Sequence, residues 1–167
     1  LFLTRNSDEF HLQSGFTFKS GDEVFKIGYC TNLTPDTIDE ANKLKVDLII
    51  THHDAWDFLY GLKDTCKQKL IEYGISHYFN HLPLDDCDFG TNNSLIEKLG
   101  LTIKHKTHEF KGFFCGRVAE LNNEISLNDL VKKLEDILSE PVKFWKFNNN
   151  GIKRIGLVCG GGGATSD

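Results

Sequence analysis

Two apolar runs in the first half of the chain end in histidine side chains. Residues 46–54 form an almost continuous apolar stretch that closes with His52 and His53, and residues 75–85 form a second stretch that contains His81 near its end. Short apolar runs bounded by polar residues are typical of strands buried in a parallel sheet. We therefore predict two buried strands that carry their imidazoles at their C-terminal ends.

Helices are expected between these strands. Thr34 followed by Pro35 is typical of a helix start, with Thr as the N-cap and Pro at the first helical position. The alternation of strand and helix predicts a parallel sheet with helices on its faces. The elements expected in this half are a strand at 24–31, a helix from Thr34, the strand with the histidine pair, a helix at 62–73 closed by Gly74, the second strand, and a helix opened by a capping box at 94–97 and closed by Gly100.

The second half continues with alternating strands and one helix. We expect strands at 102–105, 113–121, 142–147 and 152–158, a turn at 148–151, and a helix at 126–139 that Pro141 ends. The fold class is α/β, with residues 1–101 as the first lobe and residues 102–167 as the second. The sequence contains no Met, and its last residues stand where a helix would begin after a glycine run, so we expect both natural ends to be missing.

Composition places the chain among ordinary globular proteins. Of its 167 residues, 40% are hydrophobic and 26% are charged, which is enough for a real core. The formal charge of -5 argues against a general nucleic-acid binder, because phosphate binding needs a basic face. We expect no membrane contact, since no apolar run is long enough to span a bilayer. Five cysteines without a C-x-x-C pair fit a reducing cytoplasm.

The histidine pair is the strongest chemical signal. Neutral imidazoles bind Zn, Fe, Mn or Ni. Neighbouring residues of a regular strand point to opposite faces, so His52 and His53 can serve one site only if the strand bends there, or if metals lie on both sides. The alternative is one buried, hydrogen-bonded histidine beside one exposed histidine.

A second set of polar side chains follows the other strand, in the segment His81-Leu-Pro-Leu-Asp85. A carboxylate can bridge two cations, which makes Asp85 the candidate bridging ligand. The alternative for Asp85, with Asp86 and Asp88 beside it, is a solvated acidic turn. His81 can be a ligand, an orienting residue or a catalytic proton shuttle, and the spacing does not choose among these roles.

The remaining signals are weaker. His105 and His108 lie among charged residues and are interpreted as surface histidines, while His11 and His77 have no polar neighbours in sequence that would form a site. The glycine run at 160–163 lacks the Lys-Ser or Lys-Thr of a phosphate loop, so a tight turn is the simpler interpretation. Its backbone amides remain able to receive an anionic substrate.

The motifs at 49–53, 81–85 and 90–101 resemble, in order and spacing, those of the Nif-three-like family, whose members are often named GTP cyclohydrolase I type 2 homologues. The resemblance implies two similar, intertwined three-layer α/β lobes, a dinuclear centre of two divalent metal ions, and a toroidal homo-hexamer. It implies that His52, His53 and Asp85 are metal ligands, with His81 at or beside the metals.

The chain departs from this family pattern in two places. The family completes its site with a His-x-x-x-Glu element near its C-terminus, and no such element stands near the end of this sequence, so we expect further ligands beyond Asp167. The family usually has Pro after the histidine pair, where this chain has Asp54, and Asp54 or Asp57 is therefore a candidate for tuning the site.

The sequence supports competing functions. The first is a metal-dependent hydrolase that acts on a nucleotide-like or other phosphorylated small molecule, with an anionic substrate. The alternative is a non-catalytic, metal-binding regulatory or chaperone-like oligomer. A dinucleotide-binding enzyme is a third interpretation, and the broken glycine frame argues against it.

Overall fold

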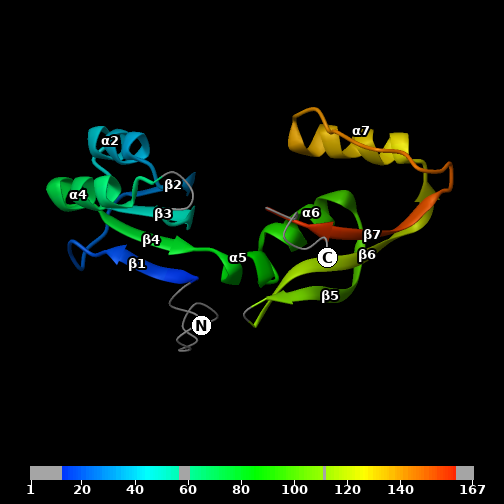
Figure 1. Ribbon diagram of the computed structural model, residues 1–167, viewed down its shortest axis with the longest axis horizontal. Helices are drawn as coiled ribbons and strands as arrows, with labels where there is room; N and C mark the ends of the chain where they lie inside the picture. Colours follow the sequence, from blue (N-terminus) through cyan, green and yellow to red (C-terminus); the bar gives the residue numbers. More distant parts are fainter. Residues whose placement is uncertain (1–12, 57–60, 111, 161–167) are drawn as a thin grey trace. The chain divides into compact units, whose positions relative to one another are not determined.

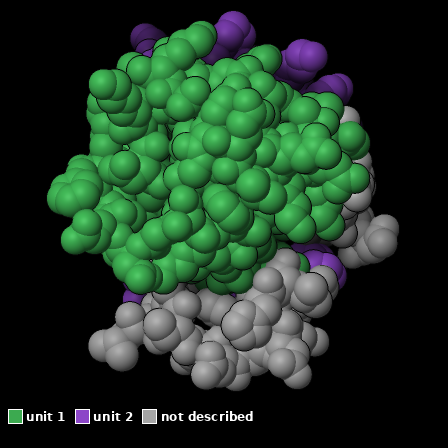
Figure 2. All heavy atoms as spheres, turned by 90° about the vertical axis from the view of Figure 1, so that its left-hand side faces the viewer, with its two compact units in different colours: residues 1–84 green, residues 85–167 purple. Residues whose placement is uncertain are grey.

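The protein is described here from a computed structural model that covers residues 13–56, 61–110 and 112–160 (Figure 1). It has a mixed α/β fold made of two compact units, Leu1–Leu84 and Asp85–Asp167, which are coloured separately in Figure 2. The lobe boundary after residue 101 stays a prediction. Within the described residues, no helix is both long enough and apolar enough to cross a membrane.

The first unit is built on a four-stranded sheet. The strands are β1 (Ser14–Phe18), β2 (Ile27–Asn32), β3 (Leu48–His53) and β4 (Ser76–Asn80), in the order β1-β4-β3-β2. The pairings of β2 with β3 and of β3 with β4 are parallel, which confirms the predicted parallel arrangement. Strand β1, which pairs antiparallel with β4, was not predicted from the sequence.

Helices α2 (Pro35–Lys43) and α4 (Lys63–Tyr73) cover one face of this sheet (Figure 1). Thr34 caps α2 as predicted: its hydroxyl accepts from the amide of Thr37. Gly74 ends α4 in the left-handed conformation, at φ 64°. The core between helices and sheet consists of buried apolar side chains, namely Leu33, Ile38, Ala41, Val46, Ile49, Ala55, Cys66, Leu70 and Ile75.

The second unit has a three-stranded antiparallel sheet made of β5 (Thr102–Phe110), β6 (Phe113–Ile125) and β7 (Ile152–Val158), in the order β5-β6-β7. Its helices are α6 (Thr91–Leu99) and α7 (Leu127–Leu138). The core is made of apolar side chains from these helices and the sheet, among them Ile96, Leu99, Ala119, Leu130 and Leu157. The short helix α5 (Leu82–Asp86) spans the boundary between the units in the sequence.

The prediction that a capping box at 94–97 opens α6 is wrong, because the helix begins one turn earlier with Gly90 as its N-cap. The side chain of Asn92 fixes that earlier turn. Its amide nitrogen donates to the carbonyl of Asp85, and its oxygen accepts from the amide of Cys159. Ser94 therefore lies inside the helix, where its amide donates to the carbonyl of Gly90.

The strand predicted at 142–147 is also wrong, since residues 141–151 have no regular secondary structure. Half of the residues at 142–147 are aromatic, namely Phe144, Trp145 and Phe147, which gives high strand propensity. Trp145 and Phe147 are nevertheless 74% and 92% exposed, so no burial favours a strand there. Propensity without a packed face does not fix an element.

Candidate metal centre

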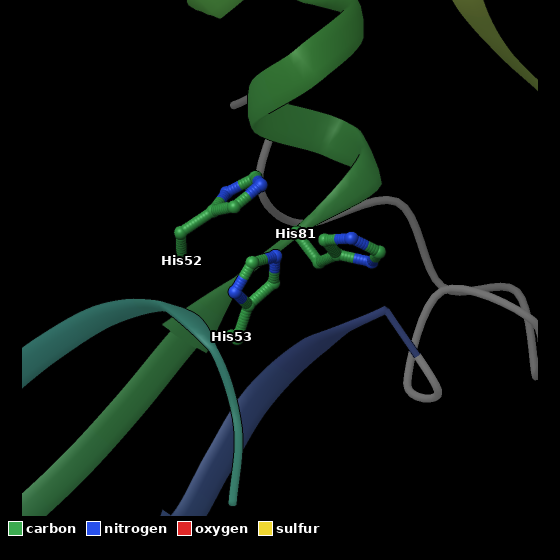
Figure 3. Close-up of side chains that lie close together, drawn as sticks. All are labelled: His52, His53 and His81. Carbon is green, nitrogen blue, oxygen red and sulfur yellow. The ribbon is translucent and has the colours of Figure 1, made fainter. Parts of the chain in front are cut away.

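Three imidazoles meet at the C-terminal ends of β3 and β4. His52 and His53 are the last residues of β3, and His81 directly follows β4. These strands are parallel neighbours, with Thr51 opposite Phe79, so their ends lie side by side. One ring nitrogen from each histidine lies within 4.8 Å of the others, which is a spacing that one metal ion can bridge. Figure 3 shows the rings converging.

The two neighbouring histidines lie in the same cluster. Their ring centroids are 4.6 Å apart, and the ring of His81 lies 4.9 Å from His52 and 5.2 Å from His53. All three side chains are partly buried. From the sequence, both side chains could point to one site only if the strand departed from its regular alternation of faces at these two residues. In the structure the pair forms the end of β3.

Each imidazole is held through its Nδ1 atom. Nδ1 of His52 lies 3.1 Å from the backbone oxygen of Asn80. For His53 the partner is Oδ1 of Asn32 at 2.6 Å, and for His81 it is Oε1 of Gln13 at 2.9 Å. Oxygen atoms of this kind accept, so each Nδ1 carries the proton and donates. The lone pair of each neutral ring is then on Nε2, the nitrogen that a metal would use.

These orienting groups were not identified from the sequence. Asn32 is the last residue of β2 and lies directly opposite His53 in the parallel pairing. The strand predicted at 24–31 ended one residue before it. Gln13 comes just before β1, and its backbone oxygen also accepts from the amide of His81 at 2.9 Å. Because β1 itself carried no clear signal, nothing in the sequence pointed to Gln13.

An indole closes one side of the cluster. The ring of Trp56 lies 5.0 Å from the ring of His81 and 5.8 Å from the ring of His53. It also meets the ring of Phe79 edge-on at 5.8 Å. Apolar groups around metal ligands lower the local dielectric and limit the access of water.

A buried histidine lies behind the pair. His77 is fully buried, and its Nε2 atom lies 2.8 Å from the hydroxyl of Thr51. Burial lowers the pKa of His77 to about 4, although the nearby carboxylate of Asp54 acts in the opposite direction. Asp54 accepts from the hydroxyl of Thr17 at 2.8 Å. His77 was not predicted to belong to a site, because its partners lie on or just after another strand.

Asp85 belongs to the second unit, so its assignment as a metal ligand stays a prediction. Its Oδ1 accepts a hydrogen bond from the hydroxyl of Thr91 at 2.6 Å. The neighbouring Asp86 is not part of a solvated acidic turn. Its carboxylate binds Lys106 at 2.7 Å and the fully buried guanidinium of Arg117 at 3.0 Å.

The weaker candidates lie in the second unit or outside the described residues. His105 and His108 are exposed on β5, which confirms that they are surface histidines. Gly160 follows β7 with φ 75°, as a turn there requires. Residues 161–164 of the glycine run lie outside the described residues, and so does Asp57.

A cavity of about 440 Å³ adjoins His52. Its walls come from residues of β2, β3 and β4, including Tyr29, Ile50 and Tyr78, which are direct partners across the sheet. Ile49, the neighbour of Ile50 on β3, packs instead in the core with α2 and α4. The cavity therefore lies on the sheet face opposite α2 and α4, and its size suits a small molecule.

Residues 5–167 match the model of a family described as Duf34/NIF3 (NGG1p interacting factor 3). A "GTP cyclohydrolase 1 type 2 homolog" of Pyrococcus horikoshii is 31% identical over 157 residues, which cover 90% of this chain and 63% of that protein. The "NGG1-interacting factor 3" of Saccharomyces cerevisiae is 27% identical, over 83% of this chain and 56% of that protein.

A solved structure of the protein ybgI, of unknown function, has the same fold. It matches with a TM-score of 0.77 at 24% identity, over 90% of this chain and 62% of that one. The chain thus spans less than two thirds of the length of each of these proteins.

Proposed function

Because this chain belongs to the Duf34/NIF3 family, we propose that it is a divalent-metal protein whose centre is built on His52, His53 and His81. The observation that supports this most directly is the set of hydrogen bonds at the Nδ1 atoms. Three separate oxygen acceptors, from Asn80, Asn32 and Gln13, orient three rings toward one point. Orientation of ligating imidazoles by such partners is the usual design of protein metal sites.

The donor set fits a divalent transition metal. Three neutral imidazole nitrogens suit Zn, Fe or Ni and also bind Mn, while Mg and Ca prefer oxygen ligands. Three protein ligands are also the number found in catalytic zinc sites, which keep a further position for water. In this proposal His81 is a ligand, which decides among the roles that its spacing left open.

Asp85 is proposed as the ligand that bridges to a second ion. It comes four residues after His81 in the sequence, and a carboxylate can be shared between two cations. The proposed centre is therefore dinuclear. It is supported by the family resemblance and by the chemistry of the carboxylate.

The reaction that best suits such a centre is hydrolysis of a nucleotide-like or phosphorylated small molecule. Bound divalent metal would lower the pKa of a water molecule and polarise substrate oxygens. The cavity beside His52 would hold the organic part of the substrate between Tyr29 and Tyr78. The printed name of the Pyrococcus relative, a GTP cyclohydrolase 1 type 2 homolog, supports a nucleotide-like substrate.

The alternative is a cytoplasmic metal-binding oligomer without turnover, acting as a regulatory or chaperone-like protein. The yeast relative is named for interaction with another protein, and this favours a binding role. A homo-hexamer is proposed in either case from the family resemblance.

Metal analysis combined with a turnover screen tests these proposals. Purified wild-type protein is expected to hold divalent metal, and His53→Ala is expected to hold much less while keeping its fold. His105→Ala, which changes an exposed histidine, is the matched control. Equal metal in all three proteins would show that the centre is wrongly assigned. Chelator-sensitive turnover of nucleotides would favour the hydrolase, and metal without turnover would favour the binding protein.

A further inference from the structure

We propose that Thr51 and His77 are positioning residues that turn the neighbouring His52 and His53 toward one site. The importance of this for metal binding rests on the proposed function, whereas the geometric part stands by itself. A strand normally sends neighbouring side chains to opposite faces, so a pair that converges needs a local device. The structure shows hydrogen bonds at this point that supply one.

The first of these bonds ties down the end of β3. The hydroxyl of Thr51 lies 2.6 Å from the backbone oxygen of His53. That oxygen can only accept, so Thr51 donates to it. A hydroxyl that binds a carbonyl two residues along offers the backbone an alternative to the regular ladder. The bond ties the carbonyl of His53, the last residue of β3, back to the side chain of Thr51.

The second bond fixes the hydroxyl itself. Thr51 has a single hydroxyl proton, which it donates in the hydrogen bond to the backbone oxygen of His53. The contact of 2.8 Å to His77 must therefore run the other way, with Nε2–H of His77 donating to the hydroxyl of Thr51. Thr51 is only 2% exposed, so no bulk water competes for this position. The chain of donors runs from His77 through Thr51 to the backbone of His53.

His77 is costly to bury, which supports a specific role. The side chain is fully buried, and its Nδ1 atom has no hydrogen-bond partner among the described residues. The nearest carboxylate oxygen, Oδ1 of Asp54, is 3.8 Å away and beyond hydrogen-bond distance. An apolar side chain would fill the same space without this desolvation cost. What the imidazole adds is an N–H group, from which the hydroxyl of Thr51 accepts a hydrogen bond.

Paired substitutions separate positioning from general packing. Thr51→Val and His77→Leu remove the hydrogen bonds and keep similar volume, while Thr51→Ser keeps the hydroxyl and His77→Gln keeps an N–H near the position of Nε2. Ser76→Ala is the control, because it removes another buried hydroxyl from the same sheet that binds the amide of Ser20 instead. Circular dichroism and thermal unfolding verify that each protein folds, and Thr51→Ala replaces Thr51→Val if the latter does not fold.

Co²⁺ is the probe for the metal side of the inference. We expect Thr51→Val and His77→Leu to bind Co²⁺ about 10–100-fold more weakly, the loss typical when a group supporting a ligand is removed, and to change the visible absorption of the bound ion. Thr51→Ser, His77→Gln and Ser76→Ala should keep wild-type affinity and spectrum. Wild-type affinity and spectrum in Thr51→Val would overturn the inference.

A second readout needs no metal. In metal-free wild-type protein the rings of His52 and His53, with centroids 4.6 Å apart, should give nuclear Overhauser effects between their protons. These should be lost in Thr51→Val and retained in Thr51→Ser. If wild-type protein bound no Co²⁺, the proposed function would fail, and the ring contacts would still decide the positioning role. Contacts that persist in Thr51→Val would contradict it.

Discussion

Oδ1 of Asn32 lies 2.6 Å from Nδ1 of His53, and the two residues are direct partners in the parallel pairing of β2 with β3. The bond links the last residue of one strand to the last residue of the next. It sets the ring orientation of His53 through sheet register, which is among the most rigid relationships in a fold. Register can therefore transmit the geometry of the sheet to the candidate metal centre.

Replacing Asn32 should weaken metal binding without unfolding the protein. Asn32→Leu removes the acceptor for the Nδ1–H of His53, and we expect about 10–100-fold lower affinity for Zn²⁺ by isothermal titration calorimetry. Asn32→Asp supplies a stronger acceptor and should retain or raise the affinity. Equal affinities in wild type and Asn32→Leu would show that this bond does not orient a ligand.

His81 should act as a ligand and not only as a proton shuttle. His81→Ala is expected to lose most bound metal in elemental analysis, because two imidazoles hold a divalent ion far more weakly than three. His108→Ala changes an exposed histidine of β5 and should bind metal like wild type. A variant at His81 that retained full metal content and lost only turnover would instead assign His81 the shuttle role.

The elements of the first unit were predictable where local chemistry specifies them. Thr34 and Pro35 define the start of α2, and Gly74 defines the end of α4 in the left-handed conformation. The strand that carries His52 and His53 was recognised because a buried parallel strand is continuously apolar. The second predicted strand, over residues 75–85, is a strand only at Ser76–Asn80, and its last residues belong to α5. Their parallel order then brought His52, His53 and His81 to one edge.

What the sequence did not reveal depends on pairing between distant segments. Gln13 reaches His81 only because β1 pairs antiparallel with β4, and the five residues of β1, Ser-Gly-Phe-Thr-Phe, are too few to give a clear periodic signal. His77 looked isolated, since its partner Thr51 lies on the neighbouring strand. The start of α6 was misplaced because a tertiary contact of Asn92 outweighed a local capping pattern.

Stability should depend on pH through His77. Burial lowers its pKa from an ordinary 6.5 to about 4. Between these values the unfolded chain binds a proton at this residue and the folded protein does not. The unfolding free energy therefore decreases as the pH falls from about 6.5 toward 4, by up to about 3 kcal/mol from this residue.

Denaturant unfolding of metal-free protein in the presence of chelator measures this effect. His77→Gln carries no titrating group, so the pH dependence between 6.5 and 4 should be shallower in this variant than in wild type. His105→Gln removes an exposed histidine and should leave the wild-type slope unchanged. Parallel slopes for wild type and His77→Gln would mean that His77 titrates normally in the folded state.

The number of ions per chain should depend on Asp85. Each ion of a catalytic centre takes about three protein ligands and a water molecule, and His52, His53 and His81 can supply that number for one ion only. If Asp85 bridges to a second ion, Asp85→Ala should reduce the metal content of the full-length natural protein from two ions to one. Asp88→Ala is the matched control, because Asp88 is an exposed carboxylate in the same segment. Elemental analysis and Co²⁺ titration count the ions. Two ions retained in Asp85→Ala would show that Asp85 is not a ligand of the centre. A single ion in wild type would rule out a dinuclear site.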